Sequence, residues 1–458
     1  MSNWKKASTV LLAIIMVLAM SVGALAATLT DGEVGGFTTA DTPVSQDKNI
    51  DLKKELTVYN VDDRTIYAPT ITYNYTVTAG PADTSITDAT TDHNNNTAVT
   101  VQTRAGILEG LKVAGAAGAT GTIAWTSAET VNASTDGTPN YKNLNLDFSG
   151  VVFGAAGVYR YTITEALPTD ATYAASGVTE TTNTTNAHVR YLDVYVRPAQ
   201  TFTDGSIAAD WDIYGYVCVL ENEAITPDGD TTETGAVKTN GFVAGENDET
   251  DYKADSYYTY NVEVSKTVHN DSYAQANHAF PFTVLFTNAT VTQPVDISSE
   301  TTGTVSGFTD PASAALSAGT TNGIVEIKDS SSVKYIGIPN GTSVEVYETN
   351  DVAGVTYQVT TVVDNDTQNQ VVDQAVVSGT KPTSATAQAA EKAMYESTKT
   401  TLAPTADVDD DTAHTIAVDN NLQVISPTGV ALRVTPYVLM LAAGVVLLVV
   451  ARRKRATR

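Results

Sequence analysis

Short runs in which apolar and polar residues alternate recur along most of the chain. Clear examples lie at residues 56–59, 71–77, 159–163 and 191–196, and each is rich in Thr, Val, Ile or Tyr. Alternation with a period of two places every second side chain on the same face of a β-strand, and β-branched and aromatic residues favour strands. Gly, Asn and Asp residues, which form turns, separate the runs. The pattern predicts an all-β fold built from antiparallel β-sandwich domains.

The amino-terminal stretch has the layout of a secretory signal peptide. Lys5 and Lys6 precede an apolar run at residues 10–20, and Ala24-Leu25-Ala26 matches a small-x-small cleavage site. We therefore expect residues 1–26 to be removed on export and residues 27–48 to form a linker ahead of the folded part.

The carboxyl-terminal stretch has the layout of a membrane anchor. An apolar run at residues 434–451 has about the 18 residues that just suffice to cross a hydrocarbon core, and the basic cluster Arg452-Arg453-Lys454-Arg455 follows it. A basic cluster beside a membrane segment stays cytoplasmic. Together with the signal peptide, this layout predicts a secreted protein that is held at the membrane by its carboxyl-terminal segment.

Composition narrows the class of partner and the kind of covalent bond available. The formal net charge is −26, and several of the basic residues lie in the two terminal segments, so the part between them is more acidic still. Such a surface repels phosphate backbones, which excludes nucleic acid as a partner. The single cysteine, Cys218, excludes an intramolecular disulfide framework. Any covalent crosslink within the chain must therefore use another chemistry.

The part of the chain between its terminal segments repeats itself weakly. Each half begins with a strand that carries a lysine in phase with its apolar residues, Lys54 in the first and Lys266 in the second. Each half later has a strand that ends in a glutamate in the same phase, Glu165 and Glu348. We therefore predict two tandem domains, at residues 49–255 and 256–425.

The charged residues in phase with apolar neighbours are the candidates for chemistry. Period-two alternation turns Lys54, Glu165, Lys266 and Glu348 toward the sandwich cores, and Asn420 is in phase with the apolar residues before it. A buried charge is costly unless it meets a partner. Either each half contains a buried salt bridge, or the lysine and the glutamate take part in a reaction.

The end of the chain resembles the cell-wall sorting signal of Gram-positive surface proteins. That signal joins a short Pro-Thr-Gly motif, here Pro427-Thr428-Gly429, to an apolar segment and a basic tail at residues 426–458. The resemblance implies that a sortase cuts between Thr428 and Gly429 and joins the threonine to an amine. Ser426 stands where the family usually has Leu or Val before Pro, a departure that concerns the class of sortase.

Further segments resemble the backbone pilins of sortase-assembled Gram-positive pili. The resemblance is carried by Asn420, which lies seven residues before Pro427, and by residues 161–168, 190–196, 264–268 and 338–341. It implies immunoglobulin-like β-sandwich domains, each locked by a self-formed amide between a lysine and an asparagine or aspartate, with a glutamate assisting.

Positions in this sequence that match the family's motifs imply two crosslinks. In the second domain Lys266 would join Asn420, with Glu348 assisting. In the first domain Lys54 and Glu165 would act on an acceptor close to the next domain, which ungapped counting places at Asp255. The alternative acceptors are Asn247 and Asn222.

The same resemblance implies polymerisation through a lysine ahead of the domain junction. Lys238 is the candidate, although the Tyr-Pro-Lys-Asn pilin motif is missing around it. The implied function is a structural pilus subunit at the cell surface, with sortase and other pilin subunits or peptidoglycan as partners. The alternative is a wall-anchored adhesin that uses the same domains as a stalk.

No enzyme activity beyond single-turnover crosslinking is expected from the sequence. The five histidines are scattered without metal-ligand spacing. The chain also has no phosphate-cradling glycine motif and no serine elbow. We therefore predict no metal site and no cofactor.

Overall fold

The computed structural model describes residues 48–425 with internal gaps, together with residues 438–447. The gaps are residues 82–85, 89–98, 102, 156, 181–187, 199–210, 220–238, 245–253, 309, 315, 322, 349–354, 365, 375–399 and 403–413. The statements below concern the described residues.

The first half of the described chain consists mainly of strands. Its elements are β1 (Asn49–Tyr59), β2 (Arg64–Tyr67), β3 (Ile71–Ala79), β4 (Ile86–Asp88), β5 (Val99–Val101), β6 (Thr103–Ala105), β7 (Lys112–Val113), β8 (Ala116–Ala117), β9 (Thr120–Trp125), β10 (Thr130–Ala133), β11 (Thr138–Asp147), β12 (Gly157–Ala166), α2 (Asp170–Ser176), β13 (Val178–Thr179), β14 (Val189–Pro198), β15 (Trp211–Val219) and β16 (Gly241–Phe242).

The second half has the same character. Its elements are β17 (Asp255–His269), α3 (Ser272–Asn277), β18 (Ala279–Thr287), β19 (Val295–Thr302), β20 (Val305–Phe308), β21 (Ala312–Ala314), η1 (Leu316–Ala318), β22 (Thr320–Thr321), β23 (Gly323–Lys328), β24 (Ser331–Pro339), β25 (Ser343–Glu348), β26 (Val355–Val363), β27 (Asp366–Gln374), β28 (Thr400–Leu402) and β29 (His414–Ile425). The predicted all-β fold is confirmed.

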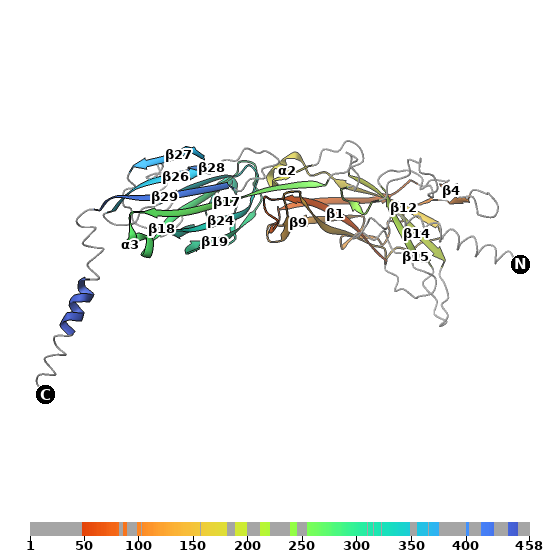
Figure 1. The fold of residues 1–458 in the computed structure, drawn as a ribbon. Coiled ribbons are helices and arrows are strands. Elements are labelled where there is room, and N and C mark those ends of the chain that lie inside the picture. The colour runs from red at the N-terminus through yellow and green to blue at the C-terminus, as the bar shows by residue number, and fades with distance from the viewer. Residues whose placement is uncertain are drawn as a thin grey trace, which may run out of the picture.

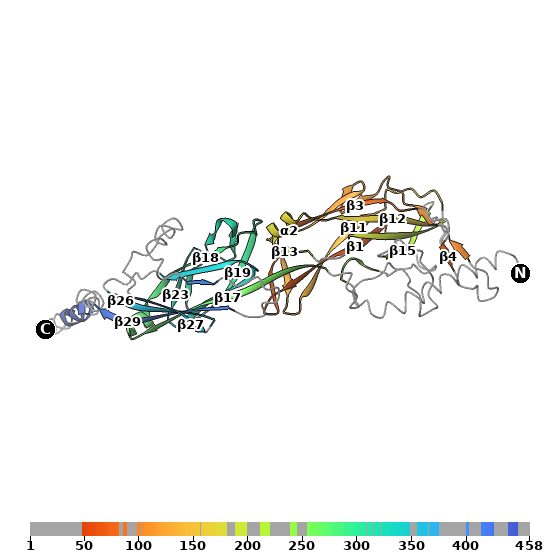
Figure 2. The same ribbon diagram turned by 90° about the horizontal axis from the view of Figure 1, so that it is seen from above.

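Each half packs two sheets face to face around its own core. In the first half, β1 and β11 face the sheet β15-β14-β12-β3-β9, and residues such as Leu56, Tyr73 and Tyr161 fill the space between the sheets. In the second half, β24, β17, β29 and β26 face the sheet β20-β23-β18-β25-β28 around a second core that includes Val264 and Phe282. Two sandwich units therefore lie end to end (Figures 1 and 2).

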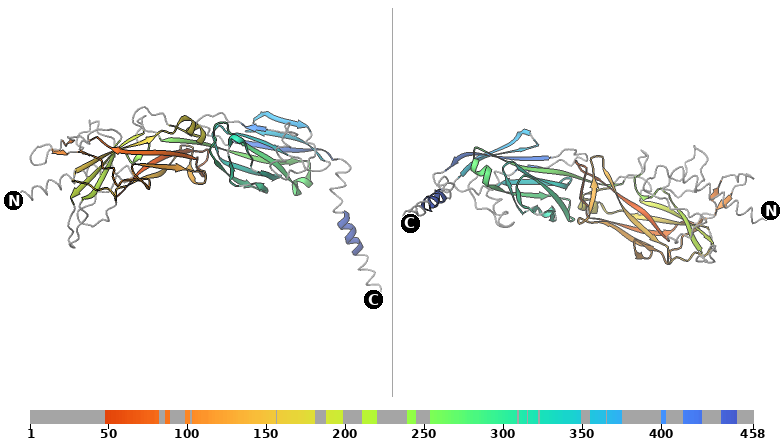
Figure 3. Two further views of the ribbon diagram at one scale, coloured as in Figure 1. Left: turned by 180° about the vertical axis from the view of Figure 1, so that it is seen from behind. Right: turned by 60° about the horizontal axis from the view of Figure 1, so that its bottom comes forward.

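Strand β17 belongs to both sandwiches. Its first residues, Asp255 to Tyr258, pair in parallel with Leu56 to Tyr59 of β1. From Thr259 onward it pairs with β24, and from Val262 also with β29. Seen from behind and from below, the strand still runs from one unit into the other (Figure 3). The predicted boundary after residue 255 thus falls at the start of β17, and the strand changes partners three residues later.

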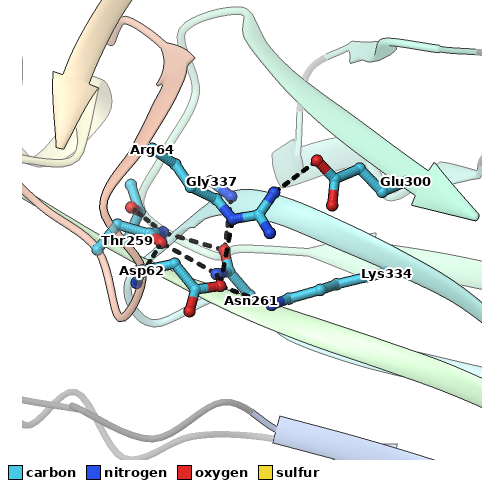
Figure 4. Close-up of polar contacts among 8 residues, drawn as sticks. Asp62, Arg64, Thr259, Asn261, Glu300, Lys334 and Gly337 are labelled. Carbon is cyan, nitrogen blue, oxygen red and sulfur yellow. Dashed lines mark hydrogen bonds and ion pairs between the residues drawn. The ribbon is translucent and has the colours of Figure 1, made fainter. Parts of the chain in front are cut away.

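A network of polar side chains joins the two units beside β17 (Figure 4). The buried amides of Asn60 and Asn261 hydrogen-bond each other in both directions, at 3.0 and 2.9 Å. Asp62 Oδ2 accepts from Lys334 Nζ at 2.6 Å and from Arg64 Nε at 3.2 Å. The three charged groups come from β24 of the second unit and from the loop and strand after β1, so they link the units from the solvent side.

The predicted membrane segment is described only in part. Residues 438–447 are helical, and large apolar side chains there, such as Leu441, are exposed. None of the helices among the described residues has the length and apolar character needed to cross a membrane. The signal peptide, residues 27–47 of the linker, Thr428 and Gly429 lie outside the described residues.

Candidate functional site

Three charged side chains that the sequence analysis named as candidates meet in the first sandwich. Lys54 Nζ, from β1, lies 3.0 Å from Glu165 Oε1 of β12 and 3.1 Å from Asp255 Oδ2 of β17. Each of the three residues is at most 4% exposed. The lysine also stands over the ring of Tyr73, 4.1 Å from its centroid. Of the three acceptors considered for this half, Asp255 is in contact with Lys54, whereas Asn222 and Asn247 lie outside the described residues.

Further polar side chains surround this first cluster. Tyr75 donates its hydroxyl to Glu165 Oε2 at 2.5 Å, and Tyr173 donates to Asp255 Oδ2 at 3.3 Å. Nδ1 of His188 lies 3.2 Å from Glu165 Oε1. The sequence reasoning did not identify these three residues. Only Tyr75 carried a signal, since it is in phase with the apolar residues of its strand.

Local structure fixes where these accessory groups lie. The short helix α2 begins at its N-cap Thr169, whose hydroxyl accepts from Thr172 N, and ends at Gly177 in the left-handed conformation. The helix buries Tyr173 on its inner side. The backbone oxygen of His188 accepts from Glu165 N at 2.8 Å, which holds the imidazole beside the carboxyl group.

The second sandwich contains the corresponding cluster. Lys266 Nζ, from β17, lies 3.1 Å from Glu348 Oε2 of β25, and Asn420 of β29 donates its amide to Glu348 Oε1 at 2.6 Å. All three residues are at most 2% exposed. The amide oxygen of Asn420 is buried and has no hydrogen-bond partner among the described residues. The ring of Phe280 lies under the lysine, with its centroid 4.8 Å from Nζ.

The strand register is the same in the two clusters. Two residues after each lysine, the strand pairs in parallel with the candidate acceptor, as Leu56 with Asp255 and Val268 with Asn420. Each glutamate pairs antiparallel with an aromatic residue, Glu165 with Tyr75 and Glu348 with Phe282. The aromatic ring under each lysine belongs to the residue two positions earlier in that same strand. The weak sequence repeat thus corresponds to a repeat of the lysine, the glutamate, the candidate acceptor and the aromatic ring under the lysine.

Strand β17 has a different role in each cluster. It supplies the acceptor Asp255 to the first cluster and the lysine Lys266 to the second. In the first cluster its parallel neighbour β1 carries the lysine, and in the second its parallel neighbour β29 carries the acceptor. One continuous strand therefore joins the two clusters.

The electrostatic surroundings of the two lysines differ. Burial opposes the charged form of Lys54, but the carboxylates of Glu165 and Asp255 outweigh burial and raise its pKa. Burial likewise opposes the charged form of Glu165, yet Lys54, His188 and Tyr75 lower its pKa to about 2. At Lys266 burial outweighs the attraction of Glu348, and the pKa of the amine is lowered. The first cluster thus favours an ion pair, and the second favours a neutral amine.

Other predicted sites lie outside or apart from these clusters. Lys238 falls outside the described residues, although Thr239 and the residues to 244 are described. Within the described part of the chain, no group of three or more His, Cys, Asp and Glu residues is arranged to hold a metal ion. Cys218 is buried in β15 with a free thiol.

Comparison with known proteins gave matches among solved structures. No protein-family model matches the sequence, and no curated protein matches it. The chain is similar to the major pilin protein T3.2 from Streptococcus pyogenes serotype GAS13637, with 17% identity, a TM-score of 0.33, and coverage of 83% of this chain and 100% of that one. A second Streptococcus pyogenes major pilin matches with 16% identity over 81% of this chain and 98% of that chain, with a TM-score of 0.31.

An adhesin is also among the similar structures. A bacterial adhesin from Mobiluncus mulieris, which contains intramolecular disulfide, isopeptide and ester bond cross-links, matches with 10% identity over 82% of this chain and 100% of that chain, with a TM-score of 0.23. Similarity at these scores decides neither fold nor function. The all-β fold follows from the chain's own strands.

Proposed function

We propose that the chain is a structural surface protein, a sortase-processed pilus subunit of Gram-positive bacteria whose two sandwiches are each locked by a self-formed amide. The observation that carries the proposal is the repeat of one lysine, one glutamate and one acceptor in the same strand register. If the lysine and the glutamate formed only a buried salt bridge, the candidate acceptor and the aromatic ring would not need to occupy the same positions in both sandwiches.

In the second sandwich the reaction joins Lys266 to Asn420. The neutral amine attacks Cγ of the Asn420 amide, the Cγ–N bond breaks, and the amide nitrogen leaves as ammonia. Glu348 acts as the acid, because turning the side-chain amide by 180° places its oxygen where a protonated Glu348 donates to it. Glu348 then carries a proton from the attacking amine to the departing nitrogen, so the glutamate is restored.

In the first sandwich the reaction joins Lys54 to Asp255. The ammonium transfers one proton to the carboxylate, the nitrogen attacks Cγ, and a Cγ–O bond breaks. The oxygen leaves as water after it receives a second amine proton through Glu165. The third proton stays on the amide nitrogen, so charge and atoms balance.

The shared strand gives the two amides a mechanical role. Tension applied near Thr428 enters β29, crosses to β17 through the amide of Lys266 and Asn420, and continues along β17 to Asp255. Residues between Lys266 and Asn420 then lie in a covalently closed loop and bear no tension. Strands tied in this way cannot be peeled apart, which suits a subunit of a fibre.

Polymerisation requires that the threonine left after sortase cleavage, Thr428, be joined to a lysine of the next subunit. Lys238 remains the candidate acceptor. The segment that follows it is bound to the first sandwich, since Thr239 N donates to Cys218 O at 2.9 Å and Lys53 N donates to Asn240 O at 2.8 Å. Such anchoring supports the transfer of tension from a bond at Lys238 into the sandwich.

The experiment that tests this function is expression of the full chain in a Gram-positive host with and without its sortase. We expect wall extracts to give a ladder of high-mass species that resists boiling in detergent, and we expect Lys238→Ala to remove the ladder. A single wall-linked band from the unchanged protein contradicts the pilus subunit and supports the adhesin alternative.

A further inference from the structure

The first cluster has a connection to the protein surface through His188. Its Nδ1 atom lies 3.2 Å from Glu165 Oε1, and its Nε2 atom lies 3.9 Å from Glu180 Oε1. The side chain of Glu165 is 1% exposed, that of His188 is 20% exposed and that of Glu180 is 33% exposed. The imidazole therefore stands between a buried carboxyl group and one that solvent reaches.

The second cluster has different contacts at the corresponding carboxyl group. The described contacts of the Glu348 carboxyl are with Lys266 and Asn420. Phe282 occupies the position that corresponds to Tyr75, and its ring has no hydroxyl to donate. The two corresponding glutamates therefore differ in their described surroundings: Glu165 contacts Tyr75 and His188, whereas Glu348 pairs with Phe282.

The polar contacts of the first cluster create a difficulty for the reaction that we proposed for the first sandwich. Lys54 lies between two carboxylates, which favour its ammonium form, and Glu165 accepts hydrogen bonds in its charged form. A nucleophilic amine and a neutral acid are both needed. The proposed proton transfer from Lys54 to Asp255 supplies the amine, and a group that can give Glu165 a proton and take it back supplies the neutral acid. Histidine is the side chain that ordinarily changes charge between pH 5 and 8.

We propose that His188 is the positioning and proton-relay residue of the first crosslink. Its imidazolium lends a proton to Glu165, which then acts as a neutral acid toward Asp255. When water has left, Glu165 returns that proton to His188, so the relay leaves the overall balance unchanged. This inference rests on the proposed amide between Lys54 and Asp255, and it assigns no role to His188 in the second sandwich.

Among the described residues, the charged or titratable groups around this relay come from several parts of the chain, and they include Tyr73 of β3 and Arg190 of β14. Glu165 is on β12, Lys54 on β1, Asp255 on β17, Tyr75 on β3 and Tyr173 on α2. Glu180, which follows β13, is the group on the solvent side. His188 thus lies between the buried carboxyl group of Glu165 and the partly exposed carboxyl group of Glu180.

The test follows the two crosslinks in the same molecules. Protein recovered unfolded in denaturant is diluted into buffers between pH 5.5 and 8, and digests taken over time are analysed for the peptides that join Lys54 to Asp255 and Lys266 to Asn420. We expect the first crosslink to form faster at the acidic end. In His188→Gln we expect its rate to fall roughly tenfold or more and to lose its dependence on pH. The second crosslink is the internal control and stays unchanged.

Matched variants distinguish a proton relay through His188 from a purely structural role of that residue. His269→Gln changes an exposed histidine of β17 and leaves both rates as they are. Glu180→Gln keeps the fold and moves the pH profile of the first crosslink to lower pH, which preserves the test if His188→Gln fails to fold. A first-crosslink profile that is identical in all variants, or a lower rate with an unchanged profile, overturns the relay. Absence of both crosslinks from the unchanged protein overturns the proposed function instead.

Discussion

Replacing Glu348 by glutamine separates the proposed amide from a simple buried ion pair. The glutamine side chain keeps the size of Glu348 and can still hydrogen-bond the Asn420 amide, which Glu348 contacts at 2.6 Å. It cannot carry protons between Lys266 and Asn420. We therefore expect Glu348→Gln to retain the fold of the second sandwich and to lose its crosslink.

The magnitude follows from the length of chain that the amide closes. By analogy with a disulfide, a bond between Lys266 and Asn420 closes a loop of roughly 150 residues and stabilises the sandwich by about 5 kcal/mol. For a unit of this size that corresponds to a fall in melting temperature of about 10–20 °C when the bond is absent. The first sandwich keeps its own crosslink and its own transition.

Calorimetry and intact mass measured on the same samples provide the assay. Glu348→Gln should regain the mass of one ammonia and lower one of two thermal transitions. The double variant Lys266→Met with Glu348→Gln is the matched control, because it removes both buried charges together. If only a lost ion pair mattered, the double variant would recover stability, whereas the amide predicts that both variants remain low. An unchanged mass deficit in Glu348→Gln refutes the reasoning.

Further predictions concern the first acceptor and the junction. Asp255→Asn should change the leaving group of the first crosslink from water to ammonia, and Asp255→Ala should remove that crosslink while the second persists; peptide mass analysis distinguishes these results. Asp62→Ala removes the contacts to Lys334 and Arg64. It should lower the free energy of unfolding by only about 0.5–1 kcal/mol, because these charged groups are partly exposed. Small-angle scattering of this variant should nevertheless show a wider range of angles between the two units. The hydrogen bond from Lys334 is the largest cause of the lowered pKa of Asp62. The contribution of this contact to stability is therefore complete above the unfolded pKa of about 3.9 and is lost only as pH falls through the lower folded pKa. Scattering profiles recorded in a series from pH 7 downward should therefore stay constant to about pH 4 and change below it, and a profile that stays constant throughout the acidic series contradicts this.

The sequence alone predicted the inner faces of the strands that carry the clusters. Four charged residues are in phase with the apolar residues of their strands: Lys54, Glu165, Lys266 and Glu348. Because side chains alternate between the two faces of a strand, a charged residue in that phase must lie on the apolar face. Asp255 came from the family resemblance and from counting along the chain, and it lies beside Lys54.

The rest of the site depends on contacts between distant parts of the chain. His188 follows a polar stretch without periodicity, and it reaches Glu165 only because β12 and β14 pair. Tyr173 reaches Asp255 from a short helix that the composition did not reveal. The exchange of hydrogen bonds between Asn60 and Asn261 arises where β17 changes partners. Pattern along one strand carries no information on which strands become neighbours.

The two amides are tested most directly by the intact mass of recombinant protein that covers residues 27–428. We predict a mass below that of the sequence by one ammonia plus one water, the losses expected from Asn420 and Asp255. A deficit of two ammonias would move the first acceptor to Asn222 or Asn247. A mass equal to that of the sequence would contradict both crosslinks.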